Sequence, residues 1–255
     1  MSVQLLDNTR KISRFIQTNT ANVIDFTQLC EVLSSILRAR VVIVSRKGKV
    51  LGLAGVDEVP MLGDLLPEEV GGHCPSELND RFLGILSTKE NVNLETLGFR
   101  NTEGMFGIVL PLISSGERYG TAFLYRTSAM FGIDDIILSE LAANILALEL
   151  IRAENAEEDE ARRMQESVDH VVDAMSTSEL RAVDALFEEL GERREGIVVA
   201  SKVADRIGVT RSVVVTSLRK LEGATVIDCR SSGMRGTYIR VINDRIFPAL
   251  EARKK

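Results

Sequence analysis

Apolar residues recur at spacings of three and four near the start of the chain, in segments 5–17 and 25–37. This pattern predicts two amphipathic helices. In the stretch RVVIVSRKGKVLGLAG, two β-branched runs flank a basic turn that contains glycine, which predicts a β-hairpin. A second strand pair is predicted at 106–113 and 120–125, with its turn at Ser114–Gly116 and the residues that follow.

Between these strand pairs, segment 56–100 is irregular, with Pro60, Pro67 and Pro75 and the pair Gly71-Gly72. Such a pattern is typical of short helices and loops.

The longest predicted element is a helix over 134–174, a segment without glycine or proline. Its first half is strongly apolar and its second half almost entirely polar, so it should leave a packed domain and continue into solvent. Such helices connect domains or pair with a partner chain. Directly after it, Ser176 stands three residues before Glu179, which predicts a capping box that opens a helix through Leu190.

The order of elements predicts an α+β protein of two domains. Helices, two strand pairs and a closing helix favour a sensory domain of the GAF or PAS type, in which an antiparallel sheet surrounds a small-molecule pocket. We expect an effector-binding domain at 1–154, a linker helix at 155–176 and a smaller domain at 177–255.

The stretch ASKVADRIGVTRSVVVTSLRKLE at 200–222 predicts a helix-turn-helix. Gly208 suits the turn because glycine tolerates positive φ, and Thr210 suits the N-cap of a second helix over 211–222. Ala204 is small enough for close helix packing, Val209 fills the space beneath the turn, and Val214 faces the first helix. The outward positions of the second helix are then Arg211, Ser212, Thr216, Arg219 and Lys220, residue types that bond base edges and phosphates.

Two strand-like runs, TVIDCR and TYIRVI, follow this motif and are joined by SSGMRG, a turn that carries Arg235. A helix-turn-helix followed by a basic hairpin is a winged helix. Charge agrees with a DNA-binding function: residues 200–255 carry a net charge of +7, whereas residues 1–199 carry −13. A basic domain on an acidic body is typical of a reader of polyanions joined to another module.

Composition changes this picture little. The chain has 255 residues, 45% of them hydrophobic, and no apolar run long enough to span a bilayer. The polar N-terminus MSVQLLDNTRK does not look like a secretion signal. The odd number of cysteines, Cys30, Cys74 and Cys229, favours reduced thiols. A cytoplasmic location without membrane contact is therefore expected.

The stretch at 200–222 together with GMRGTYIRVIND closely resembles the CodY family, nutrient-responsive global repressors of low-GC Gram-positive bacteria. LLDNTRKI, VVIVSRKGKVLG, LPLISSGERYGT and the linker helix extend the resemblance over nearly the whole chain. It implies an N-terminal GAF domain, a long connecting helix and a C-terminal winged helix-turn-helix, and such a DNA-binding protein is expected to be a homodimer because a two-fold protein reads two half-sites. It also implies that GTP and branched-chain amino acids strengthen binding to operators of amino-acid and adaptation genes.

The resemblance places the DNA-binding helix-turn-helix on 200–219 without a gap. It implies that Ser201 and Lys202 hold phosphate at the start of the first helix, with Ala200 beside them. Arg211, Ser212 and Thr216 would face the groove, and Arg219 with Lys220 would clamp the backbone. The wing would contribute Arg235.

The implied GTP contacts are the first hairpin turn, Ser45, Arg46, Lys47 and Lys49, and the linker-helix position Glu149. Cations and a hydroxyl beside Gly48 suit a triphosphate, although a solvated hairpin tip has the same composition. The turn is not a phosphate-binding P-loop, which needs an upstream glycine and a hydroxyl after the lysine. A family lysine near Glu149 is Glu154 here.

For the amino-acid effector, isoleucine or valine, the resemblance implies contacts from Met61, Leu66 and Thr96. The family arginine that holds the ligand carboxylate is missing from VDEVPMLGDL, before the turn Leu66–Glu69. Arg81 and Arg100 are candidate replacements. Met61 and Leu66 also suit a plain hydrophobic core.

No enzyme motif stands out. His73 and Cys74 are adjacent, but His170 is far away in the sequence, so neither a zinc site nor a Cys-His catalytic pair is expected, and no catalytic cofactor either. Two hypotheses remain: a ligand-gated DNA-binding repressor, and a nucleotide-hydrolysing GTP switch, for which the sequence offers no water-orienting residue or magnesium ligand.

Overall fold

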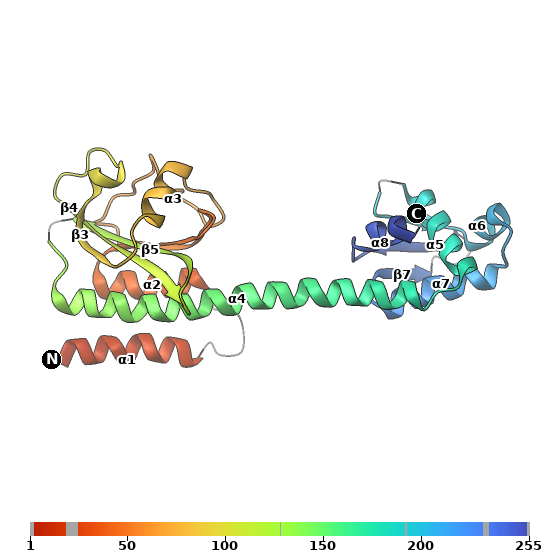
Figure 1. Cartoon of the computed structure of the whole chain (residues 1–255), viewed down its shortest axis with the longest axis horizontal. Helices are drawn as coiled ribbons and strands as arrows, with labels where there is room; N and C mark the ends of the chain where they lie inside the picture. Colours follow the sequence, from red (N-terminus) through yellow and green to blue (C-terminus); the bar gives the residue numbers. More distant parts are fainter. Residues whose placement is uncertain (1–2, 19–24, 128, 192, 232–234, 254–255) are drawn as a thin grey trace. The chain divides into compact units, whose positions relative to one another are not determined.

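In the computed structural model, residues 3–18, 25–127, 129–191, 193–231 and 235–253 are described (Figure 1). The helices and strands, in chain order, are α1 Val3–Thr18, α2 Phe26–Leu37, β1 Arg40–Ser45, β2 Val50–Ala54, α3 Ser76–Leu83, β3 Lys89–Asn93, the 3-10 helix η1 Leu94–Leu97, β4 Met105–Ser114, β5 Glu117–Thr127, α4 Ile133–Asp173, α5 Thr177–Leu190, β6 Glu195–Val198, α6 Ala200–Ile207, α7 Arg211–Gly223, β7 Ile227–Ser231, β8 Thr237–Val241 and α8 Ile246–Arg253. The predicted α+β class is confirmed.

The chain forms two compact units, Met1–Asn155 and Ala156–Lys255, and α4 runs through the boundary between them. Within the described residues, every helix is either too short or too polar to cross a bilayer.

The first unit is built on a five-stranded antiparallel sheet in the order β2-β1-β5-β4-β3. Successive residues of a strand point to opposite faces, and both faces are covered. On one face Val41 and Ile43 of β1 join a core formed with α1, α2 and the first half of α4. On the other, Val42 and Val44 join a core with α3, η1 and the loop after β2. Figure 1 shows α3 on one side of the sheet and α2 and α4 on the other.

The hairpin β4–β5 turns at Ser115 and Gly116, both with positive φ, between the paired residues Ser114 and Glu117. This two-residue turn matches the natural twist of paired strands. Strand β3 was not expected, because it lies at the sheet edge and its sequence KENVN is mostly polar, without a buried face.

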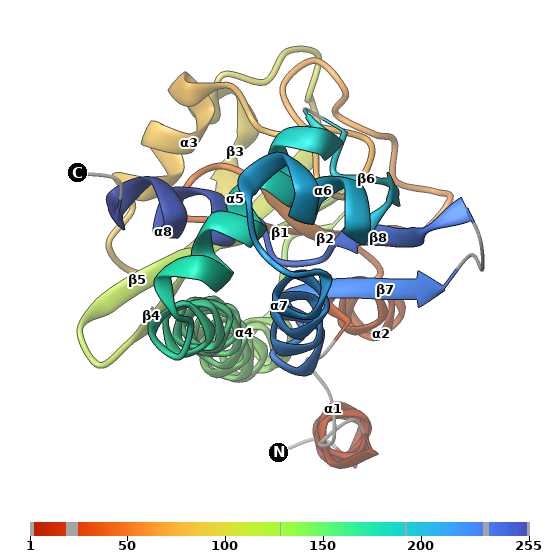
Figure 2. The ribbon, with the colours of Figure 1, turned by 90° about the vertical axis from the view of Figure 1, so that its right-hand side faces the viewer.

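The second unit packs α5, α6, α7, α8 and the end of α4 against a three-stranded sheet in the order β6-β8-β7 (Figure 2). The predicted capping box is confirmed: Ser176 N donates to Glu179 Oε2 at 2.8 Å and Glu179 N to Ser176 Oγ at 3.3 Å. The sequence pattern did not indicate β6, a strand of four residues, or α8. Residues 232–234 of the predicted wing turn lie outside the described residues.

Candidate functional site

Helices α6 and α7 pack as the sequence predicted. Gly208 ends α6 with φ of +70°, and Val209 N then donates to Ala204 O at 3.0 Å. Ala204 and Val214 are both buried between the helices, and Val209 packs at the edge of the same core. The small side chain of Ala204 and the β-branched side chains of Val209 and Val214 therefore pack α7 against α6.

One face of α7 is exposed and polar. It carries Arg211, Ser212, Thr216 and Arg219, whereas Val214, Ser217, Leu218 and Leu221 are buried on the other side. Positions 212, 216 and 219 follow the helical spacing of four and three, so their side chains share one stripe. Within the described part of the chain, no acidic group pairs with Arg211 or Arg219, which leaves both guanidinium groups available to an anion.

The start of α6 adds two exposed polar residues, Ser201 and Lys202, beside the half-buried Ala200. Thr210 occupies the N-cap of α7 as predicted, but its exposed hydroxyl makes no capping hydrogen bond to the helix. This hydroxyl therefore remains open to an external partner.

Lys220 lies apart from the exposed face. Its Nζ donates to Ala174 O and to Glu179, each at 2.9 Å, and its side chain is 34% exposed against 11% for Glu179. The hydrogen bond from Lys220, together with that from Ser176 N, lowers the pKa of Glu179. Lys220 thus ties α7 to the start of α5, and we do not carry it forward as a clamp on the DNA backbone.

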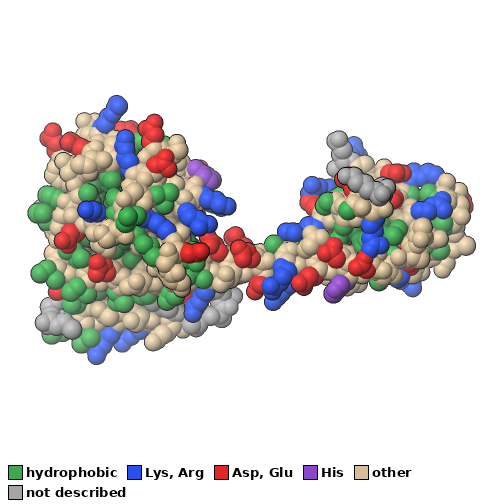
Figure 3. All heavy atoms as spheres, in the orientation of Figure 1, with side chains coloured by type: hydrophobic (Ala, Val, Ile, Leu, Met, Phe, Trp, Pro, Cys, Tyr) green, Lys and Arg blue, Asp and Glu red, His purple; other side chains and the backbone are tan. Residues whose placement is uncertain are grey.

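The wing strands carry more positive charge than the sequence prediction included. Arg235 is exposed two residues before the start of β8. Arg230 and Arg240, on neighbouring strands, both approach Asp228 Oδ2, at 3.3 Å and 3.7 Å. Their shared position on one face of the sheet becomes evident only from the pairing of β7 with β8. Figure 3 shows further Lys and Arg side chains on the surface of this unit.

In the first unit, the basic turn between β1 and β2 is closed by Ser45. Lys49 N donates to Ser45 Oγ at 3.1 Å, and Ser45 N donates to Lys49 O at 2.8 Å. Gly48 has φ of +83°, and Arg46, Lys47 and Lys49 are exposed. The three cations therefore face solvent from a fixed turn, whereas the Ser45 hydroxyl already accepts a hydrogen bond within the turn.

This turn lies next to the start of β5. Arg46 N donates to Tyr119 O at 2.9 Å, so the turn of the β1–β2 hairpin lies beside the first residues of β5. Desolvation and the carboxylates of Glu117 and Glu154 raise the pKa of Tyr119, and Arg46 opposes this effect. Glu154 of α4 thus lies close enough to act on the same ring.

Glu149 of α4 is buried, and its Oε1 accepts a hydrogen bond of 2.6 Å from Arg152 Nη1. The structure places the predicted nucleotide residues on the turn and on α4, with Glu149 held by an internal ion pair.

Met61 and Leu66 line one small pocket, as expected for parts of a common site. The other lining residues are Arg40, Val42, Leu53, Ala54, Leu62, Pro67 and Tyr125. Thr96 lies elsewhere: it is exposed on η1, its hydroxyl donates to Asn93 O at 2.7 Å, and it does not line this pocket.

The two arginines considered as replacements for the missing family arginine are not in this pocket. Arg81 donates to Leu97 O at 2.8 Å and lies directly against Gly98. Arg100 is exposed and lines a neighbouring pocket of about 220 Å³ with Pro60, Met61, Leu62, Gly63, Asp64, Phe99, Asn101 and Met105. The cation that does line the Met61–Leu66 pocket is Arg40, which sequence reasoning missed because it precedes Met61 by 21 residues and lies on β1, whereas Met61 lies in the loop after β2.

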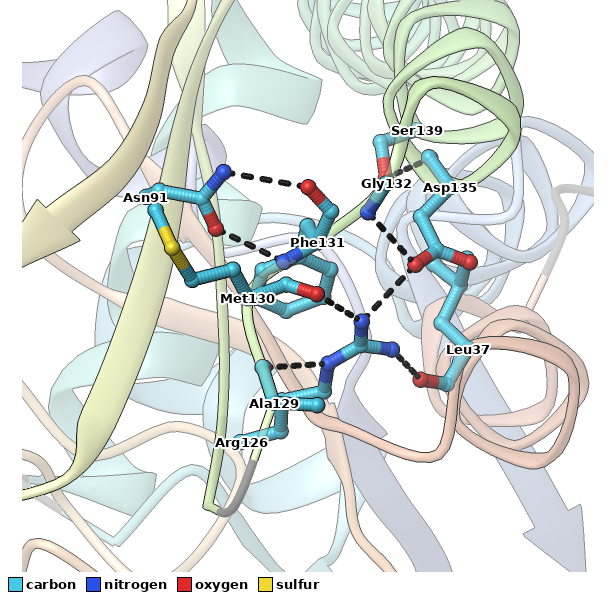
Figure 4. Close-up of polar contacts among 9 residues, drawn as sticks. All are labelled: Leu37, Asn91, Arg126, Ala129, Met130, Phe131, Gly132, Asp135 and Ser139. Atoms are coloured by element: carbon cyan, nitrogen blue, oxygen red, sulfur yellow. Dashed lines mark hydrogen bonds and ion pairs between the residues drawn. The ribbon is translucent and has the colours of Figure 1, made fainter.

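A polar cluster fixes the start of α4 to the sheet (Figure 4). The guanidinium of Arg126, at the end of β5, donates to Leu37 O at 2.9 Å, to Ala129 O at 3.0 Å and to Met130 O at 2.7 Å. It also pairs with Asp135 Oδ2 of α4 at 2.8 Å. One side chain therefore joins β5, the end of α2 and the first turn of α4.

Asn91 of β3 completes this cluster: Phe131 N donates to Asn91 Oδ1 at 2.7 Å, and Asn91 Nδ2 donates to Phe131 O at 3.0 Å. The aromatic ring of Phe131 lies 4.1 Å from Arg126 Cζ. The segment that leads into α4 is thus held through both backbone polar groups of Phe131.

Two family models match the chain. Residues 4–174 match the family described as the CodY GAF-like domain, and residues 194–254 match the CodY helix-turn-helix domain. The global transcriptional regulator CodY of Caldanaerobacter subterraneus subsp. tengcongensis is 38% identical over 258 positions, covering 98% of this chain and 99% of the relative. That of Staphylococcus saprophyticus is 35% identical over 256 positions, with the same coverage.

Among solved structures, the cofactor-binding GAF domain of the nutrient sensor CodY from Clostridium difficile is 32% identical. It covers 59% of this chain and 99% of its own, with a TM-score of 0.43.

Proposed function

Because this chain belongs to the CodY family, we propose that it is a global transcriptional regulator that binds operator DNA, mainly as a repressor of amino-acid metabolism and adaptation genes. Residues 177–255 bind the DNA, and residues 1–154 bind effectors that raise the affinity. The linker 155–176 joins them, and the protein acts in the cytoplasm as a homodimer.

The observation that carries this proposal is the exposed stripe of α7. Arg211 and Ser212 begin the second helix of a helix-turn-helix and Thr216 lies one turn further along, where the recognition helix of such motifs meets base edges. Arg219 lies about two turns after Arg211, and Ser201 and Lys202 lie in the first turn of α6. Arg219 and Lys202 serve the phosphates, which fix the position of the protein but carry no sequence information.

Two classes of effector follow from the first unit. GTP binds the cations of the turn, Arg46, Lys47 and Lys49, since charge-assisted bonds suit a triphosphate. A branched-chain amino acid, isoleucine or valine, binds the pocket lined by Met61 and Leu66. Both act through a coupling free energy, so operator DNA must raise the affinity for the effectors by the same factor.

A second copy of the chain supplies the other half of the reader. A dimer reads two half-sites, and its operator is then a palindrome with a fixed half-site spacing. Exposed apolar residues of α4, Ile133, Ile137 and Leu148, offer a surface for this contact.

Fluorescence anisotropy of labelled promoter DNA from a branched-chain amino-acid operon tests the proposal. The protein is titrated at fixed physiological salt, because affinity for DNA depends steeply on salt. Four conditions are compared: no effector, GTP, isoleucine or valine, and both. We expect tighter operator binding with each effector and weak binding to scrambled DNA. Equal affinity for scrambled DNA in all four conditions would contradict the proposal.

A matched phosphate-release assay with GTP addresses the alternative of a hydrolysing switch. The proposal expects no sustained turnover, with or without operator DNA.

A further inference from the structure

Arg40 is a half-buried cation with unused hydrogen-bond donors. Its Nε donates to Val59 O at 2.7 Å. Among the described residues, no other hydrogen bond and no acidic partner involves its guanidinium. A guanidinium offers donors in a fork that matches a carboxylate, and the resulting bonds are charge-assisted. The group is therefore prepared for an anion.

The structure holds Arg40 in place from two sides. Gly55 lies directly beneath it, since a Cβ at this position would come within 2.5 Å of Arg40 Cγ. Tyr125 is on the other side: burial raises the pKa of its phenol to about 12, although the nearby charge of Arg40 opposes the shift. The Tyr125 hydroxyl donates to Pro60 O at 3.3 Å, so it also fixes the loop that covers the pocket.

The rest of the pocket is apolar. Val42, Leu53, Ala54, Leu62 and Leu66 face the same space as Arg40, and no Asp or Glu is among the residues that line it in the described chain. The pocket thus offers a partner for a carboxylate and a surface for a short aliphatic tail, without an acidic group for an ammonium ion.

We propose that Arg40 binds the carboxylate of a short branched aliphatic acid whose tail enters the pocket beneath Met61 and Leu66. This inference rests on the proposed effector function of the first unit, and it assigns the cation that recognises the ligand. Both an α-amino acid and the corresponding 2-oxo acid have this chemistry.

Ligand entry requires a movement of Met61. The free volume of the pocket, about 10 Å³ for the centre of a water molecule, holds about one water. Met61 and Leu62 separate it from the neighbouring pocket of about 220 Å³. The side chain of Met61 is 41% exposed, so turning it outward joins the two spaces at little cost in buried surface.

Isothermal titration calorimetry of the full chain tests the assignment without DNA. The ligands are isoleucine, valine, 3-methyl-2-oxobutanoate and isobutylamine, which lacks the carboxylate. We expect binding of at least one acid class and none of the amine; whether the amino acids or the 2-oxo acid bind tighter identifies the source. Binding of the amine as tight as that of valine would overturn the proposal.

Three variants locate the contact. Arg40→Met should weaken acid binding by about 10-fold to 100-fold, since two charge-assisted bonds are lost. Ala54→Leu adds side-chain volume at a position that lines the pocket while Arg40 itself is kept, and it should weaken acid binding similarly. Arg100→Met, which removes the rival cation, should leave it unchanged. Loss with Arg100→Met but not with Arg40→Met, or unaltered binding by Ala54→Leu, would assign the ligand to the other pocket.

Failure of this inference is distinguishable from failure of the proposed function. Operator affinity without effectors, and its increase with GTP, are measured by anisotropy on the same three variants, with thermal unfolding to show that each is folded. The proposed function expects both to persist when Arg40 is replaced, because neither involves this pocket.

Discussion

At the scale of single residues, the proposed DNA contacts divide into base readers on α7 and phosphate contacts that include Lys202 of α6. Thr216 lies in the middle of the exposed stripe, and Lys202 at the start of α6. We expect Thr216→Ala to weaken operator binding by about 1–3 kcal/mol with little effect on scrambled DNA, and Lys202→Met to weaken both alike with a smaller salt slope. Anisotropy on both DNAs at several salt concentrations measures the difference; an equal loss on both from Thr216→Ala would remove it from the set of base readers.

Lys220, unlike its neighbour Arg219, already pairs with an acidic residue of the protein, Glu179. Lys220→Met removes the hydrogen bond that lowers the pKa of Glu179, and it should cost about 1–3 kcal/mol of folding free energy at neutral pH. A carboxylate whose pKa is lowered in the folded state contributes stability above its unfolded pKa of about 4.3, and this is lost as pH falls through the folded value. The difference from wild type should therefore shrink below about pH 4.

Urea unfolding from pH 3 to pH 7 measures this dependence. Arg219→Met is the matched control, because Arg219 is exposed and has no acidic partner among the described residues. It should affect DNA binding and leave stability nearly unchanged, whereas Lys220→Met should do the reverse.

At the scale of elements, the sequence predicted the helix caps and turns that depend only on residues close together in the chain. The capping box of Ser176 and Glu179 and the turn at Gly208 each require only a few adjacent residues, and both are present as expected. Strands β3 and β6 were not predictable in this way, because each is short and lies at a sheet edge, so its pairing partner defines it. Arg40 was missed for the same reason: strand pairing, not spacing, brings it to Leu53 and Tyr125.

Two glycines with positive φ show how differently the elements depend on them. At Gly236, φ is +119° and a Cβ would lie 2.6 Å from Val198 O, so Gly236→Ala forces β8 away from β6. At Gly208, φ is +70° and the space is open, so Gly208→Ala pays only the left-handed penalty of about 1–2 kcal/mol. We expect the larger loss of unfolding free energy from Gly236→Ala, measured by urea denaturation. Equal losses would mean that the wing adapts to the side chain.

At the scale of the whole molecule, the proposed effectors bind the first unit and the proposed DNA contacts lie in the second, and α4 runs through the boundary between the two units. Arg126 is the side chain that joins Leu37, Met130 and Asp135 to the end of β5. Arg126→Met should lower the factor by which GTP and amino acids raise operator affinity, while affinity without effectors stays within about twofold. Anisotropy with and without saturating effectors gives the coupling factor; a factor equal to that of wild type would exclude the cluster as a route.

Arg10→Met, a change at an exposed ion pair on α1, is the control for the loss of one arginine from the same unit. Exposed pairs of this kind contribute little to stability, so both effectors should keep their full influence on operator affinity.

A dimer is the assembly that an operator with two half-sites requires, and α4 offers an apolar stripe for it. Ile133, Ile137 and Leu148 are 76%, 47% and 55% exposed and are separated by four and eleven residues, which places them on one side of the helix. Covering these apolar side chains with a second copy removes them from water, which stabilises the dimer. Replacing Ile137 by Asp buries a charge in the interface and should convert the dimer to a monomer at micromolar concentration.

Sedimentation equilibrium measures the mass, and Glu158→Ala, in the exposed polar half of α4, is the matched control. Two separate monomers must bind to fill both half-sites of one operator. Ile137→Asp should therefore also weaken operator binding and make it depend on the square of the protein concentration. Binding to a single half-site should be unaffected, since the reading face of α7 lies in the other unit. A dimeric Ile137→Asp protein with normal operator affinity would place the contact between copies on another surface.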